Sequence, residues 1–238
     1  MHEIHSHNLK EIAARYAVNH FVSSGMKIGL GTGSTAAYAV EALAERIRTD
    51  GLALGRLVAT SDETEQLALF HGMSAGQELT PAVGWLDVTI DGADEVDGDL
   101  NLIKGGGGAL MREKLVAVRT LREVIIVDEG KVSAQLGEKH ALPVMIVPSA
   151  WETTADRVEQ VCGACPKLRQ TPTGEPFVSD DGLYCLDVET GAIKDPAVME
   201  SRIKGLTGVV DVGLFIGLAH TVVVAMADGS VQILGDTQ

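Results

Sequence analysis

Apolar residues follow a helical period in residues 9–23, and this pattern ends near Gly25. Beyond it, short apolar runs alternate with longer amphipathic stretches. Strands are predicted at residues 27–30, 57–60, 86–90 and 123–127, and helices at residues 36–48, from residue 61, and at residues 109–118. Asp62 is expected to cap the second of these helices, because Glu65 follows it at capping-box spacing. Strands separated by helices predict an α/β fold with a parallel sheet.

A polar or glycine-rich turn follows each of the four predicted strands. These turns begin at Gly31, Ser61, Asp91 and Asp128. The carboxyl ends of parallel strands lie along one edge of a sheet, and ligands bind in the crevice outside that edge. The four turns together therefore predict a ligand site there.

The pattern changes after residue 137, where prolines become frequent. Helices are predicted at residues 151–162 and 196–203, and strands at residues 177–178 and 183–188. Residues 209–234 are rich in β-formers around a hairpin turn at 227–230, and we expect them to rejoin the first domain. The predicted domains are residues 1–137 with 209–238, and a smaller α+β domain over residues 138–208.

Lys104 precedes four consecutive glycines, Gly105–Gly108. Such a run is costly to order and adds nothing to a core, so its expected use is close approach of the backbone to an anionic ligand. In the helix that follows, Arg112, Glu113 and Lys114 point about 100° apart, and at least one should face inward. A carboxylate among apolar neighbours can serve as a general base, although periodicity alone does not favour Glu113 over Arg112.

The net charge of −14 argues against binding to nucleic acid or to an anionic membrane surface. No apolar run is long enough to span a membrane, and the first ten residues are polar, so no signal peptide is expected. Three cysteines, an odd number, fit a reducing compartment, and we expect a cytoplasmic protein. Cys162 and Cys165 form a C-x-x-C pair, but no second ligand pair follows, which favours structural thiols over a zinc or redox site.

The turn GLGTGSTA (29–36) lies between a predicted strand and a predicted helix. A dinucleotide site would require an acidic residue at the end of the second strand, and none is present there. The hydroxyl groups and free N–H groups of this turn suit a single phosphate better, and a tight turn without a ligand remains the alternative.

The acidic turn DGADE (91–95) follows the third predicted strand. A calcium loop is excluded because Gly98 occupies the place of the bidentate glutamate. A magnesium site at Asp91 and Asp94 stays open but has no further support. These carboxylates can instead bind sugar hydroxyls and relay protons, with Lys104 supplying positive charge.

Three motifs in this order, GLGTGSTA (29–36), TIDGADE (89–95) and KGGGGALMREK (104–114), resemble ribose-5-phosphate isomerase of the A type. The resemblance runs over nearly the whole chain. It implies a Rossmann-like, mostly parallel sheet domain with a second, smaller α+β domain near the C-terminus. It also implies interconversion of D-ribose 5-phosphate and D-ribulose 5-phosphate in the non-oxidative pentose phosphate pathway. No cofactor and no metal is expected, and the chain is expected to form a homodimer or homotetramer.

The resemblance further implies individual roles. Glu113 matches the proton acceptor, and Lys104, Asp91 and Asp94 match the groups around the reacting carbons. The implied substrate-binding residues are Thr32, Gly33, Ser34, Thr35, Asp91, Gly92, Ala93, Asp94, Lys104, Gly105, Gly106, Gly107 and Lys131. The family's N-terminal lysine is left unassigned, with Lys10 as a candidate. Met145 and Ser149 depart from the pattern, in the second domain and away from the chemistry.

Two other classes remain as alternatives. A non-catalytic sugar-phosphate sensor would carry a basic DNA-binding segment, for which the sequence before residue 27 leaves no room. A nicotinamide-dependent oxidoreductase is disfavoured by the missing ribose-binding acid.

Overall fold

The computed structural model describes residues 2–236, with side chains from residue 9 onward. The chain divides into two compact units, and each is discontinuous in sequence. The first contains the residues up to 93, residues 112–131 and the residues from 217 on, and the second contains residues 94–111 and 132–216. Among the described residues, no helix combines the length and apolarity that crossing a membrane requires.

A seven-stranded sheet forms the centre of the first unit. Its order is β3 (Ala75–Gly76), β2 (Leu57–Ala59), β1 (Ile28–Leu30), β4 (Val88–Gly92), β7 (Glu123–Asp128), β13 (Thr221–Ala225) and β14 (Val231–Gly235). All neighbouring pairs are parallel except β13 and β14, which form the predicted hairpin. The Rossmann-like, mostly parallel sheet is thereby confirmed. The strand order reverses between β1 and β4, the place where such sheets bind ligands.

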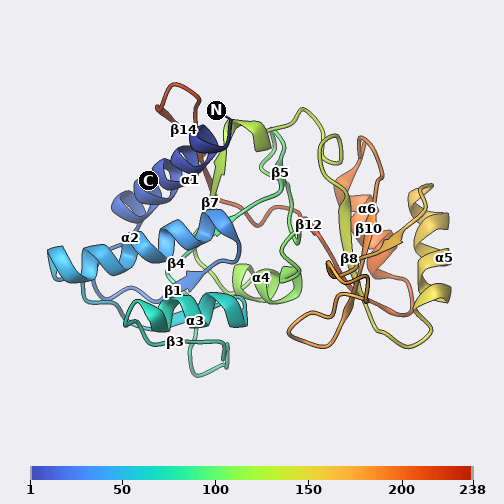
Figure 1. The fold of residues 1–238 in the computed structure, drawn as a ribbon, viewed down its shortest axis with the longest axis horizontal. Coiled ribbons are helices and arrows are strands. Elements are labelled where there is room, and N and C mark those ends of the chain that lie inside the picture. The colour runs from blue at the N-terminus through green and yellow to red at the C-terminus, as the bar shows by residue number, and fades with distance from the viewer. Residues whose placement is uncertain (1, 237–238) are drawn as a thin grey trace. The chain divides into compact units, whose positions relative to one another are not determined.

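Helices cover both faces of this sheet. α1 (His2–Phe21) and α2 (Ser34–Asp50) pack side by side on one face (Figure 1), where alternate strand residues such as Ile28 and Leu30 join their core. On the opposite face, Val116 of α4 (Leu110–Ala117) lies over Gly29, because a Cβ atom there would come within 2.8 Å of its Cγ1. The first unit therefore has the helix–sheet–helix layers expected of an α/β domain.

The N-terminus of α3 (Asp62–Phe70) differs from the prediction by one residue. Ser61, not Asp62, is the cap, and its hydroxyl oxygen accepts a hydrogen bond from the N–H of Thr64 at 3.1 Å. Serine is among the preferred capping residues, and the Asp62 carboxylate instead accepts hydrogen bonds from Arg112 and Gln77.

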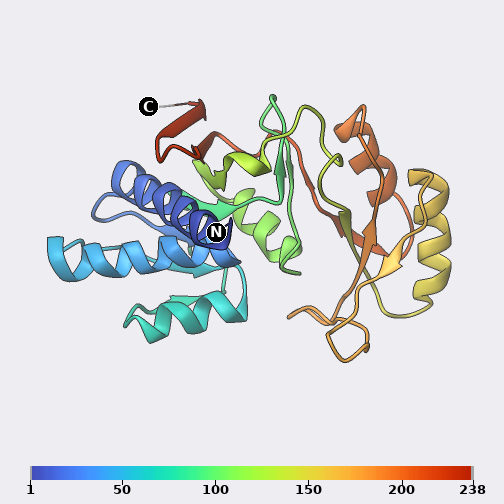
Figure 2. The ribbon, with the colours of Figure 1, turned by 45° about the horizontal axis from the view of Figure 1, so that its top comes forward.

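The second unit contains a four-stranded sheet in the order β11 (Val209–Val212), β8 (Leu142–Ile146), β10 (Tyr184–Val188) and β9 (Lys167–Leu168). All its neighbouring pairs are antiparallel. The helices α5 (Trp151–Cys162) and α6 (Pro196–Lys204) lie beside one another and enclose a core with this sheet (Figure 2). This is the α+β part that the sequence predicts.

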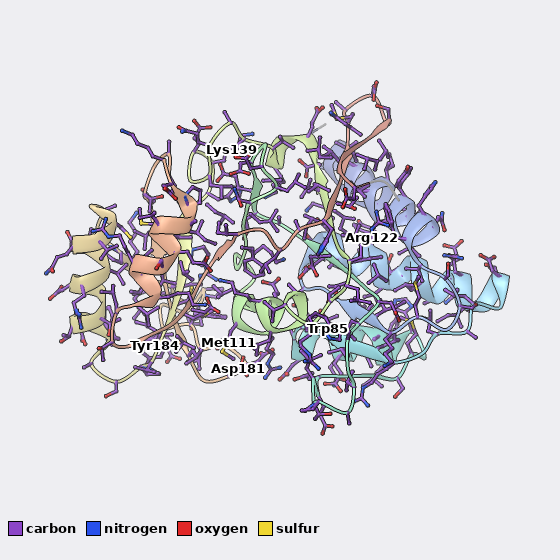
Figure 3. The ribbon with its side chains drawn as sticks, turned by 180° about the vertical axis from the view of Figure 1, so that it is seen from behind. Trp85, Met111, Arg122, Lys139, Asp181 and Tyr184 are labelled. Carbon is purple, nitrogen blue, oxygen red and sulfur yellow. The ribbon has the colours of Figure 1, made fainter. Side chains whose placement is uncertain are left out.

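The predicted strand at residues 177–178 does not form. Val178 makes only an isolated bridge to Tyr184, across the turn that contains Asp181 (Figure 3). The turn itself is closed by the N–H of Gly182, which donates to the carbonyl oxygen of Ser179 at 2.9 Å.

A small antiparallel sheet of three two-residue strands also belongs to the second unit. It consists of β5 (Glu95–Val96), β6 (Leu102–Ile103) and β12 (Leu214–Phe215). Because Val209 pairs with Ile146 and Leu214 with Ile103, residues 209–216 do not rejoin the first unit as expected, and the chain returns there only at residue 217. Residues 94–111, expected in the first domain, belong to the second unit, because their strands β5 and β6 form this small sheet with β12.

Candidate active site

The turn between β1 and α2 presents free N–H groups at the switch point of the large sheet. Gly33 caps α2 with φ of 102°, a conformation that favours glycine, and no side chain occupies the helix N-terminus as a cap. The first N–H groups of a helix have no partner within it, and together with the helix dipole they attract anions. Nζ of Lys10, on α1, donates a hydrogen bond to Oγ of Ser34 at 2.9 Å. This corner of the first unit is therefore suited to a phosphate group.

A cluster of four hydroxyl groups lies next to this turn and is hydrogen-bonded to it. Oγ1 of Thr32 lies 2.6 Å from Oγ1 of Thr60 and 2.8 Å from Oγ of Ser61. Thr64 completes the cluster, 3.3 Å from Thr32, and its hydroxyl donates to the carbonyl oxygen of Gly31 at 2.9 Å. The hydroxyl group of Thr32 thus ties the ends of β1 and β2 together, while its backbone remains part of the turn.

Asp91 lies at the carboxyl end of β4 and is 1% exposed. Its Oδ1 accepts hydrogen bonds from the N–H of Thr32 at 3.2 Å and from its neighbour Gly92 at 2.7 Å. Gly31 makes room for this carboxylate. The end of β4 and the turn after β1 therefore form one connected structure within the first unit.

Glu113 lies on α4 and is 6% exposed, as is the neighbouring Lys114. Leu115 is 52% exposed, so this helix buries two charged residues while an apolar one faces outward. Burying charge is unfavourable for stability alone, and groups kept buried in this way are candidates for function. At least one of the three charged residues was expected to face inward, and two of them, Glu113 and Lys114, are buried.

Arg112 turns the other way, toward α3. Its Nη1 donates to Oδ1 of Asp62 at 2.9 Å and also bonds to Oε1 of Gln77, whose Nε2 reaches Oδ1 of Asp62 at 2.8 Å. The hydrogen bond from Arg112 holds the pKa of Asp62 below its ordinary value, and Gln77 acts in the same direction. The arginine therefore ties α4 to α3, next to the candidate base.

The second unit carries the remaining candidates. Lys104 follows β6, is 2% exposed, and has its Nζ 5.5 Å from the ring centre of Phe215. Its N–H donates to the carbonyl oxygen of Gly213 at 2.9 Å. Asp94 begins the unit, and its Oδ2 accepts a hydrogen bond from the N–H of Gly106 at 2.7 Å. A lysine and a carboxylate are thus fixed at the two ends of the segment that leads to the glycine run.

The predicted site residues fall into two groups, one in each unit. Thr32, Gly33, Ser34, Thr35, Asp91, Gly92, Ala93, Glu113 and Lys131 belong to the first unit, and Asp94, Lys104, Gly105, Gly106 and Gly107 belong to the second. Lys131 ends the short 3-10 helix Glu129–Lys131, directly after β7. The chain passes between the groups at the peptide bond that joins Ala93 to Asp94.

Sequence reasoning missed three features of these groups. It left Lys10 unassigned, and it gave no role to the hydroxyl groups of Thr60 and Thr64 or to Arg169, which contacts the glycine run. The polar end of the second predicted strand and the SxxT segment from Ser61 to Thr64, which forms part of the family resemblance, were the signals for the hydroxyl cluster. Among residues 9–236, no three His, Cys, Asp or Glu side chains gather in a way that could hold a metal ion.

The fold and these groups define a doubly wound α/β enzyme with a turn suited to an anion and a buried carboxylate. The family model described as Ribose 5-phosphate isomerase A (phosphoriboisomerase A) matches residues 56–229. The chain is 49% identical to Ribose-5-phosphate isomerase A of Thermomicrobium roseum, over 92% of this chain and 91% of that protein. The chain belongs to the ribose 5-phosphate isomerase A family and is an isomerase.

Solved structures agree with this assignment. Ribose 5-phosphate isomerase from Plasmodium falciparum superposes with a TM-score of 0.91 at 37% identity, covering 98% of this chain and 100% of that one. A structure of D-ribose-5-phosphate isomerase in complex with phospho-erythronic acid gives a TM-score of 0.91 at 34% identity, over 97% and 99% of the two chains. The predicted fold and the predicted family are therefore confirmed.

Proposed function

We propose that this enzyme interconverts D-ribose 5-phosphate and D-ribulose 5-phosphate through an enediolate, with Glu113 as the base. The observation that carries the proposal is the uncapped N-terminus of α2 at the carboxyl end of β1, with Lys10 at Ser34. A phosphate is the dianion that such a turn binds. The family relatives that carry this function in their names support the choice of substrate.

The isomerisation moves one proton between neighbouring carbons and a second between their oxygens. Glu113 takes the proton from C2 of the aldose and returns it to C1, so one carboxylate serves both steps. The proton on O2 is transferred to O1, and Asp91, with Asp94, is proposed to carry this transfer. The sum of the steps leaves the enzyme in its starting protonation state.

The intermediate carries negative charge on an oxygen, and fixed positive charge lowers its free energy. Lys104 and the N–H groups of Gly105 and Gly107 are proposed to supply it, while the N–H group of Gly106 holds Asp94. The low exposure of Lys104, 2%, supports this role because charges act more strongly away from water.

The phosphate group acts as an anchor. The turn of Thr32–Thr35 with Lys10 is proposed to hold it, and Lys131, with Gly92 and Ala93, to contact the rest of the substrate. Binding energy at a remote group then positions the reacting carbons against the base.

The proposal includes the context that the family resemblance implies. The enzyme is placed in the cytoplasm and in the non-oxidative pentose phosphate pathway, without a metal or cofactor, and as a homodimer or homotetramer. Exposed apolar side chains on the first unit, among them Trp85 (Figure 3) at 51% and Leu121 at 59%, support self-association. Light scattering during size-exclusion chromatography would distinguish the oligomeric states.

The test is a coupled assay that follows ribulose 5-phosphate formed from ribose 5-phosphate. Turnover that survives exhaustive EDTA treatment is the expected result, and a nicotinamide requirement or a lack of turnover would refute the proposal. In heavy water, the ribulose 5-phosphate should gain deuterium at C1, because the proton on a carboxylate exchanges with solvent.

A further inference from the structure

Arg169 binds the carbonyl side of the glycine run. It directly follows β9, and its Nη1 donates to the carbonyl oxygen of Gly105 at 2.9 Å and to that of Gly106 at 3.1 Å. Hydrogen bonds from a charged donor are stronger than those between neutral groups. The two peptide groups that carry these oxygens are therefore fixed in orientation.

Each of these two carbonyl oxygens shares a rigid peptide group with the N–H of the next glycine, so fixing the oxygen also fixes the direction of that N–H. No cis peptide bond occurs in the part of the chain that the structure describes, and in a trans peptide the C=O and N–H bonds point in opposite directions. The N–H groups of Gly106 and Gly107 consequently point away from the guanidinium. That of Gly106 donates to Oδ2 of Asp94 at 2.7 Å, and both glycines are exposed.

Asp187 holds the arginine in place. Its Oδ2 accepts from Nε of Arg169 at 2.9 Å, and its Oδ1 accepts from Nη2, so the pair forms a planar fork. The guanidinium also lies 5.7 Å from the ring centre of Phe177. Burial alone would lower the pKa of Arg169, but the hydrogen bonds and charge of Asp187 keep it above its ordinary value, so the group remains charged.

Only an arginine can make this set of contacts. Two carbonyl oxygens and both oxygens of a carboxylate are reached from one rigid plane, whereas the single ammonium of lysine cannot span them. Arg169 therefore does more than balance the charge of Asp187.

We propose that Arg169, held by Asp187, is a positioning residue that aims the N–H group of Gly107 at the oxygen on which charge develops and the N–H group of Gly106 at Asp94. The inference rests on the proposed isomerase reaction. Arg169 acts through the glycine backbone and through Asp94, and not on the substrate itself. Preorganised N–H groups of this kind stabilise a transition state more than a ground state.

The test compares Arg169→Lys and Asp187→Asn with the control Lys167→Ala. Lys167 lies two residues before Arg169, on β9, and pairs with Glu189 at 2.7 Å, but both partners are more than 70% exposed and neither is bonded to the glycine run. The control thus removes a neighbouring cation–carboxylate pair and leaves the contacts of Arg169 with Asp187 and the glycine run unchanged.

Three measurements decide the outcome. In Arg169→Lys, hydrogen exchange of residues 105–108 should become faster, while the control keeps the wild-type rates. The turnover number for ribose 5-phosphate should fall about tenfold or more with KM changed by less than about threefold, because the loss is concentrated in the transition state. Phospho-erythronic acid, whose carboxylate provides anionic oxygens next to the phosphorylated chain, should bind more weakly by calorimetry, while inorganic phosphate binds as in the wild type.

An unchanged turnover number, or wild-type exchange at residues 105–108 in both variants, would overturn the inference. Asp187→Asn keeps the arginine and removes the charge and one of the two acceptor oxygens of its support, so it decides the question if Arg169→Lys does not fold. A wild-type protein without isomerase turnover would refute the proposed function alone. Hydrogen exchange and binding of phospho-erythronic acid would still test the positioning of the glycine run.

Discussion

A Cβ atom added to Gly31 would lie 2.1 Å from Oδ1 of Asp91 and 2.6 Å from its Cα. Neither atom can move away easily, because Oδ1 of Asp91 binds two backbone N–H groups and Cα belongs to the central strand β4. The end of β1 and the carboxylate at the end of β4 are therefore compatible only while residue 31 has no side chain.

Gly31→Ala should consequently lower both stability and activity. Overpacking of this kind typically destabilises a protein by about 1–3 kcal/mol, and the displaced carboxylate should reduce turnover at least tenfold. Urea unfolding and the coupled isomerase assay would measure the two effects. Gly98→Ala is the control, because a Cβ atom there would meet nothing within 4 Å. Equal behaviour of the two variants would contradict the prediction.

Glu113→Gln should fold normally and lose most of its turnover. The amide has nearly the same size as the carboxylate but cannot accept the proton from C2, and general base catalysis is typically worth about 10²–10⁴-fold. Circular dichroism would check the fold, and the coupled assay with solvent deuterium exchange would check the chemistry. Lys131→Ala serves as the comparison, with an expected increase in KM at a nearly unchanged turnover number. Wild-type turnover in Glu113→Gln would refute the assigned mechanism.

Thr64→Val should destabilise the first unit and weaken phosphate binding. The hydroxyl group of Thr64, which donates to the carbonyl oxygen of Gly31, is lost, and a buried acceptor left without its donor typically destabilises by about 1–3 kcal/mol. Thr49→Val removes an exposed hydroxyl that bonds to a helix carbonyl oxygen at 3.1 Å, and it should change stability by less than about 0.5 kcal/mol. Thermal unfolding with and without inorganic phosphate would measure both effects. Equal melting temperatures and phosphate affinities in the two variants would contradict the interpretation of the cluster.

The sequence predicted β1, β2, β4, β7 and the hairpin of β13 and β14, because these have clear apolar runs or turn signals, but it missed β3, which is two residues long. It did not predict the assignment of residues 94–111, since β5 and β6 are two residues long, and β6, which β5 pairs with, has its other partner β12 more than 100 residues later in the chain. Strands of this length have no periodicity of their own.

In the candidate site too, features that depend on neighbouring residues could be predicted, and contacts between residues far apart in the sequence could not. The turns at Gly31 and Asp91 could be predicted because strand ends and glycines are local signals. Lys10 contacts a residue 24 positions away and Arg169 contacts one 64 positions away, and no local pattern indicates such partners. The preference for Glu113 over Arg112 came from the family resemblance, and the structure adds that Arg112 is bonded to α3.

Cys185 should make stability depend on alkaline pH. Burial raises the pKa of this thiol to about 12, so the unfolded chain ionises first, near pH 9, and the native state loses stability as the pH rises above that value. The slope for one such group approaches about 1.4 kcal/mol per pH unit between the two pKa values. Cys185→Ala should therefore unfold with a shallower dependence on pH between 9 and 10.5 than the wild type, as measured by urea titrations. Parallel curves for the two proteins would contradict this assignment.

Thiol reagents provide an independent check on the same cysteine. At pH 8, exposed Cys165 should react with a thiol reagent such as DTNB, whereas Cys185, which is fully buried, should react only after unfolding. Rapid labelling of Cys185 in the native protein would refute its assigned environment.

The position of β13 has a consequence for the order in which the chain can fold during translation. This strand lies between β7 and β14 in the large sheet, but it is made of residues 221–225. Until these residues leave the ribosome, β7 is an open edge of apolar residues, which other chains can pair with. The second unit, whose last strand ends at residue 215, can complete its pairing first. We therefore expect a released chain truncated after residue 216 to carry a folded second unit and a first unit in which β7 remains an open edge.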